Sequence, residues 1–103
     1  MVVIGLFNSA FLVAQGNVTD VELRTLLAEI RNIEDNAQVI RLIPNHASAF
    51  HNRGLAFYSM GNLDQAVADF TEVIRLDPDH EAARASIEYI LQLEIYRRLK
   101  WRK

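Results

Sequence analysis

The chain has 103 residues but no cysteine, only two prolines and only four glycines. Without cysteine it can form no disulfide bond, no thiolate metal site and no cysteine nucleophile. The glycines, Gly5, Gly16, Gly54 and Gly61, are too far apart to form a glycine-rich loop that binds phosphate. Half of the residues are hydrophobic and 23% are charged, a composition typical of globular proteins. The length fits a single domain, residues 1–103.

Basic side chains are scarce over most of the chain. Residues 1–96 carry thirteen acidic and six basic side chains, a net charge of −7, whereas residues 97–103 carry five basic side chains. Nucleic-acid binding needs a broad basic face that neutralises phosphates, so the acidic body argues against a nucleic-acid partner. Two interpretations of the basic tail stay open: a solvated helix end, or contact with an anionic membrane or an acidic partner.

The apolar N-terminal segment, residues 1–16, carries no charge at all. Eleven of its first fourteen residues are apolar, but a membrane-spanning helix needs about 20. No basic residue precedes Arg24, although a secretory signal normally begins with one. We therefore expect a helix buried on all sides and hypothesise that it lies in or near the interface of a homodimer. A leader at residues 1–14, cleaved from a secreted protein, is the alternative.

An internal repeat becomes visible when the sequence is shifted by 34 residues. Residues 39–50 then lie over residues 73–84 with seven of twelve positions identical. Self-similarity at a period of this length is the signature of helical repeat proteins.

A helix–turn–helix is predicted between the two prolines of this repeat. Apolar residues recur at helical spacing over 47–60 and again over 63–76. Gly61 is suited to a left-handed helix C-cap and Asn62 to the N-cap of the next helix. Pro78 ends the second helix, because proline fits a first turn but not a helix interior.

Small residues in both helices predict where they approach most closely. A glycine inside a helix costs about 0.5–1 kcal/mol, so Gly54 needs a packing reason. We expect Gly54 to lie opposite Ala66 in the neighbouring helix. Phe50, Phe57 and Phe70 would then fill the space on either side.

These residues resemble the pattern of the tetratricopeptide repeat, which residues 47–80 match in full. The positions that carry the resemblance are Phe50, Gly54, Phe57, Ala66, Phe70 and Pro78. Arg53 and Val73 depart from it, since the family often has Leu and Ala there. The resemblance implies a non-enzymatic module for protein–protein interaction.

The flanking segments keep only part of this pattern. Asp20, Asn32 and Asn36 stand where the preceding repeat would need small or aromatic residues. For residues 19–43 we prefer one long helix, begun by a capping box of Thr19 and Glu22, over a degenerate repeat. Residues 81–103 are predicted to form a capping helix that ends in the basic tail. The fold class is thus all-α, an antiparallel helical array with an N-terminal helical extension.

The resemblance also implies a concave surface lined by the first helix of the hairpin and by the next helix. The residues expected there are Ser48, His51, Asn52, Leu55, Tyr58 and Ser59, followed by Ala85, Ser86, Tyr89 and Gln92. Their mixture of aromatic, hydroxyl and amide groups suits an extended peptide or a partner helix. A clamp for chaperone tails is not expected, because Ala82 and Ser86 stand where the family uses basic residues.

No pattern in the sequence indicates catalysis. His46 and His80 occupy the same repeat position just before a helix, where a polar capping role explains them. Ser48 and His51 lie three residues apart, without a carboxylate partner or a nucleophile turn. We predict no catalytic residue, no metal site and no cofactor.

The function that follows is a cytoplasmic scaffold or assembly adaptor that binds a protein or peptide. One alternative is a self-associating structural protein whose groove is filled by its own N-terminal helix. The other is a peripheral or secreted helical factor.

Overall fold

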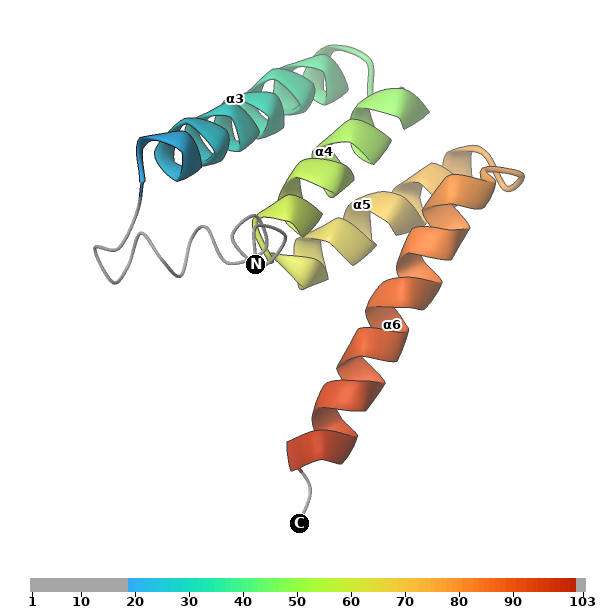
Figure 1. Ribbon diagram of the computed structural model, residues 1–103. Helices are drawn as coiled ribbons and strands as arrows, with labels where there is room; N and C mark the ends of the chain where they lie inside the picture. The colour runs from blue at the N-terminus through green and yellow to red at the C-terminus, as the bar shows by residue number, and fades with distance from the viewer. Residues whose placement is uncertain (1–18, 102–103) are drawn as a thin grey trace.

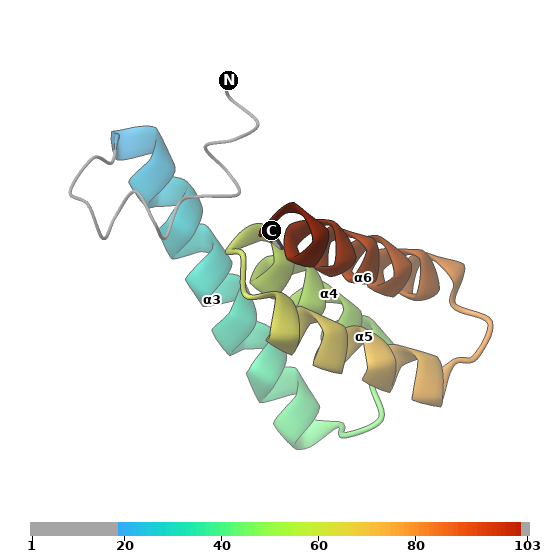
Figure 2. The same cartoon turned by 90° about the horizontal axis from the view of Figure 1, so that it is seen from below.

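The computed structural model describes residues 19–101, which form four α-helices joined by short turns (Figure 1). They are α3 (Asp20–Leu42), α4 (Ala47–Ser59), α5 (Leu63–Leu76) and α6 (Glu81–Trp101). Each helix packs on the next one in the chain, and no strand occurs in this range. Figures 1 and 2 place α3 and α6 on opposite sides of the α4–α5 hairpin. The predicted all-α array is confirmed, whereas the expectations for the apolar N-terminal segment fall outside the described residues.

Helix α3 is one continuous helix of 23 residues, without the break that a second hairpin would need. Thr19 begins it: the hydroxyl oxygen of Thr19 accepts a hydrogen bond of 3.1 Å from the backbone N–H of Glu22. This satisfies one of the N–H groups that a helix start leaves without an intrahelical partner. Leu26 is the one α3 residue that is buried.

The turn between α4 and α5 is built by Gly61, whose φ of 80° is the left-handed conformation expected for a C-cap glycine. The N–H of Gly61 donates to the carbonyl of Tyr58 at 3.0 Å, and that of Asn62 to Phe57 at 2.9 Å. These two bonds form a Schellman motif and satisfy carbonyls at the end of α4. Asn62 is the N-cap of α5, but its side chain makes no capping hydrogen bond.

Two histidines cap helices at equivalent positions of the 34-residue period. The Nδ1 atom of His46 accepts from the N–H of Ala49 at 3.0 Å, at the start of α4. The Nδ1 atom of His80 accepts from the N–H of Ala83 at 3.1 Å, at the start of α6. The capping role predicted for both histidines is confirmed.

The core lies between α4, α5 and the first half of α6. Its fully buried residues are Ala66, Phe70, Val73, Ala83 and Ile90, against which Phe50 and Phe57 pack. The nearest neighbour of Gly54 is Phe70 and not Ala66, the partner predicted from the sequence. A Cβ atom at Gly54 would find three ring carbons of Phe70 as its nearest neighbours, the first at 2.8 Å. Glycine therefore makes room for the Phe70 ring, rather than chiefly for contact with Ala66.

A partly buried ion pair joins the two helices of the hairpin. Arg53 donates from Nε and Nη2 to the two carboxylate oxygens of Asp69, both at 2.8 Å. Asp69 is only 4% exposed, and the guanidinium lies 5.7 Å and 5.9 Å from the ring centroids of Phe50 and Phe57. Two parallel N–H···O bonds are the strongest geometry for such a pair. This contact explains why Arg53 departs from the family pattern.

Candidate partner-binding site

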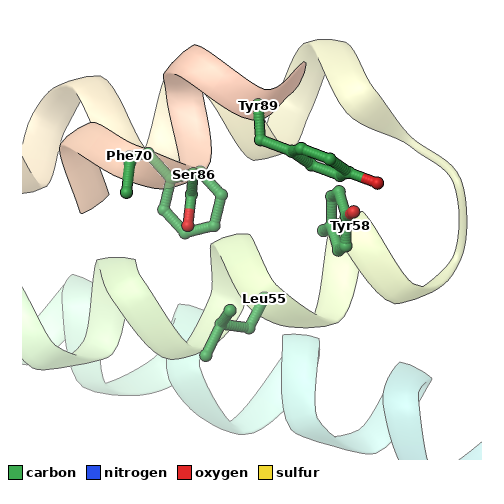
Figure 3. Close-up of a pocket in the computed structure, with 6 residues that line it drawn as sticks. Leu55, Tyr58, Phe70, Ser86 and Tyr89 are labelled. Atoms are coloured by element: carbon green, nitrogen blue, oxygen red, sulfur yellow. The ribbon is translucent and has the colours of Figure 1, made fainter. Parts of the chain in front are cut away.

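A hollow of about 260 Å³ lies between α4 and α6, and we call it the α4–α6 hollow. Its lining consists of Leu55 and Tyr58 from α4, Phe70 from α5, and Ala85, Ser86 and Tyr89 from α6. Figure 3 shows Tyr58 and Tyr89 close together at one end, with Phe70 and Ser86 toward the other. Leu55 is 42% and Tyr89 is 51% exposed, so the lining can be reached from solvent.

Helical spacing explains why these side chains meet. Leu55 and Tyr58 are three residues apart on α4, and Ser86 and Tyr89 are three apart on α6, so each pair shares one face of its helix. Phe70 reaches the hollow from behind, because Gly54 leaves space for its ring beneath α4. Three different helices therefore contribute to one surface.

The two tyrosines form the polar end of the hollow. Their ring centroids are 6.4 Å apart with the planes inclined by 59°, a geometry in which aromatic pairs attract. Partial burial raises the pKa of Tyr58, and the neighbouring Tyr89, including a hydrogen bond with it, raises it further. The Tyr58 phenol therefore stays protonated at neutral pH and lies, with Tyr89, beside the apolar side chains of the lining.

His51 lies next to the hollow but does not line it. Its ring centroid is 5.7 Å from that of Phe70 and 4.8 Å from that of His80. Burial lowers the pKa of His51, and the neighbouring His80 lowers it further. His51 is thus a neutral ring at pH 7 that packs between α4 and the start of α6.

The structure places part of the predicted concave set in the lining of the hollow and the rest, including His51 and Gln92, outside that lining. Leu55, Tyr58 and Tyr89 line the hollow together with Ala85 and Ser86. The remaining predicted residues on α4 do not line it: Ser48 and Asn52 are exposed, and Ser59 is partly buried. The sequence reasoning missed Phe70, which it assigned to packing alone. The signal in the sequence was a glycine in one helix together with an aromatic residue in the neighbouring helix, because a ring that packs against the glycine can extend past it to the next surface.

The lining of the hollow combines apolar side chains with a few hydroxyl groups. It offers apolar surface, one serine hydroxyl and two phenols, and no carboxylate or histidine. Over residues 19–101 no group of three or more His, Cys, Asp or Glu side chains is placed to hold a metal ion. Within the same residues, no helix combines the length and the apolar character needed to cross a membrane.

Comparison with protein families matches residues 47–80 to the tetratricopeptide repeat. The chain carries one such repeat. It consists of α4, α5, the turn that joins them and the turn that follows α5, so the resemblance seen in the sequence is confirmed. Repeats of this kind stack into extended surfaces that bind other proteins. An interaction with a protein partner, in general terms, follows from its presence.

The relatives match about half of the chain. Proteins described as FK506-binding protein-like from Mus musculus, Homo sapiens and Rattus norvegicus are each 36% identical to the chain over 50 residues. The match covers 48% of this chain but only 14% of the length of each relative. No solved structure matches the chain.

Proposed function

We propose that the chain is a non-enzymatic interaction adaptor that holds a partner protein by one apolar side chain seated in the α4–α6 hollow. The observation that carries this proposal is an apolar lining left open between two helices, with Leu55 and Tyr89 about half exposed. A tetratricopeptide repeat beside it supports the same class of function.

The size of the hollow limits what it can hold. At about 260 Å³ it lies just below the ~300–1,000 Å³ of pockets for whole small molecules. One Leu, Met or Phe side chain is the occupant we propose. Burying such a side chain is worth about 1.5–3 kcal/mol, which alone gives only weak binding. Ser86 donates its hydroxyl proton to the carbonyl of Ala82 at 2.9 Å, so its oxygen is the group that would accept a hydrogen bond from the backbone of the partner, as in other modes of peptide recognition.

The test uses a random-peptide phage library panned on the full chain. Affinities of the selected peptides are then measured by fluorescence anisotropy with the wild type and two variants. Ala85→Arg places a long charged side chain in the hollow and should weaken binding by about tenfold or more, equivalent to about 1.4 kcal/mol. Ala82→Arg is the matched control, since Ala82 is exposed on the same helix but does not line the hollow.

The outcome decides between the hollow and other surfaces. Loss of affinity in Ala85→Arg alone supports the proposal. Equal affinities of both variants and the wild type would place the peptide elsewhere, and a failure to select any peptide would contradict an open binding hollow.

A further inference from the structure

Two histidine rings from different parts of the fold meet beside the α4–α6 hollow. His51 belongs to α4, and His80 lies in the turn between α5 and α6. Their ring centroids are 4.8 Å apart, and that of His51 is also 5.7 Å from that of Phe70. Phe70 in turn lines the hollow (Figure 3). The two histidines therefore connect the start of α6 with a wall of the hollow.

The cap that His80 forms requires a ring without a proton on Nδ1. That atom accepts a hydrogen bond of 3.1 Å from the N–H of Ala83. An imidazolium carries a proton on both ring nitrogens and accepts no hydrogen bond. A cation at this place is also disfavoured by the positive end of the helix dipole. Protonation of His80 would therefore leave the start of α6 without its cap.

His51 favours the neutral ring for a different reason. It is partly buried, with Phe70 and His80 as its aromatic neighbours. Burial lowers the pKa of His51, and His80 lowers it further. The packed arrangement thus favours His51 without a proton. If both rings were protonated, two cations would lie side by side and repel each other.

The other charged groups of this region are paired or belong to the turn before α6. Two ion pairs involve the charged residues of α5 that flank Phe70, namely Asp69 with Arg53 and Glu72 with Arg75. The charged residues closest to His80 in the chain are Asp77, Asp79, Glu81 and Arg84. Arg84 binds the carbonyl of Pro78. Among the described residues, His80 is the group whose charge acts on His51, so the two rings form one unit.

The first turn of α6 leads directly from this unit into the hollow. Ala83 is fully buried in the core, and Ala85, two residues later, lines the hollow. We propose that His51 and His80 make the hollow sensitive to pH: it binds its partner while both rings are neutral and loses affinity when either takes up a proton. This inference rests on the function proposed above. Histidine is the side chain that ordinarily changes charge between about pH 5 and 8, so mild acid would release the partner.

The experiment measures the affinity of a peptide for the full chain as a function of pH. The peptide comes from the panning described above, is one whose affinity Ala85→Arg lowers, and has no histidine, no acidic side chain and an amidated C-terminus. Its affinity is followed by fluorescence anisotropy from about pH 7.5 to about pH 5. We expect a fall of about fivefold or more, because fewer molecules are then in the state that binds.

Substitutions at the caps identify the groups responsible. The double variant His51→Gln, His80→Asn should lose most of the pH dependence, since asparagine caps a helix without titrating in this range. His46→Asn is the matched control. It makes the same change at the equivalent cap of α4, where Nδ1 of His46 accepts from the N–H of Ala49, and should keep the full pH dependence.

A second measurement needs no peptide. In amide NMR spectra of the free chain, the signals of Ala83 and Ala85 should move together over the same pH range. The midpoint should be shared with the ring signals of the histidine pair, and the movement should be absent from the double variant. Circular dichroism over this range should show that the helices persist.

The outcomes separate this inference from the function on which it rests. A constant affinity, or a double variant that keeps the pH dependence, would overturn the inference and leave the proposed function intact. A loss of affinity that coincides with loss of the helical signal would reflect unfolding and would also overturn it. A failure to select any peptide would instead contradict the proposed function. The amide signals then test the histidine pair alone, and signals of Ala85 that do not follow the pH would count against it.

Discussion

The contact between Gly54 and Phe70 leads to a prediction that runs against helix propensity. Gly54 is in the interior of α4, where alanine is normally preferred by about 0.8–1.0 kcal/mol. Gly54→Ala would place a Cβ atom 2.8 Å, 3.0 Å and 3.2 Å from Cε1, Cδ1 and Cζ of the Phe70 ring. We expect this substitution to destabilise the protein.

The magnitude follows from how little the ring can yield. Ordinary contacts between carbon atoms are about 3.5–4.0 Å long, so the ring or the helix must move by several tenths of an ångström. Phe70 is fully buried, and overpacking of this kind costs about 1–3 kcal/mol. After the gain in helix propensity is subtracted, the free energy of unfolding should fall by up to about 2 kcal/mol.

A double-mutant cycle with Phe70→Leu isolates the contact. The leucine lacks the outer ring atoms and has a flexible end, so Gly54→Ala in this background should be stabilising by up to about 1 kcal/mol. The four proteins are compared by urea unfolding followed by circular dichroism, at one protein concentration because self-association affects apparent stability. A change of sign between the two backgrounds is the expected result.

Asn52→Ala is the matched control for this cycle, because Asn52 is exposed on the same helix and does not face Phe70. It should gain a few tenths of a kcal/mol in both backgrounds. If Gly54→Ala stabilised the wild type as much as it stabilises Phe70→Leu, the steric explanation of Gly54 would be wrong.

Two further predictions concern charged groups near the hairpin. Arg53→Leu leaves the carboxylate of Asp69 buried without its partner and should lower the free energy of unfolding by about 1–3 kcal/mol. Replacing both residues by leucine should recover part of this loss. If the effects of the two single substitutions, measured by urea unfolding, were additive in the double variant, the pairing would be contradicted. The pKa of His51 lies below its ordinary value of 6.5, so below that pH the unfolded chain binds the proton more readily. Stability should therefore be unaffected by His51 above pH 6.5 and should fall as the pH drops from 6.5 to the lowered pKa of His51. The slope of Tm against pH should be shallower in His51→Gln, and identical slopes would refute this.

Much of the fold was predictable because it depends on short-range signals. Gly61 at the turn and the 34-residue period located the hairpin. The same period placed His46 and His80 before helices, where both cap. In each case one residue type suits a local backbone geometry, so the prediction needs only residues that are close together in the sequence.

The features that were missed depend on how helices face one another. Arg53 and Asp69 are 16 residues apart on different helices, and their pairing requires the rotation of each helix about its axis. The extent of the hollow has a related cause. Helix α6 forms the hollow with Leu55 and Tyr58, but the sequence does not state where α6 crosses α4, so it could not tell which residues of the predicted concave set line the hollow.

Phe70 links the stability of the repeat to its proposed binding surface. One part of its ring fits the space left by Gly54, and another part lines the α4–α6 hollow. A side chain added at Gly54 can be accommodated only if the ring moves or the helices separate, and a ring that moves away from α4 changes the shape of the hollow. The glycine is therefore needed twice, once for the approach of α5 to α4 and once for the depth of the hollow. A substitution there should weaken peptide binding in molecules that are still folded, because stability and recognition depend on the position of the same ring.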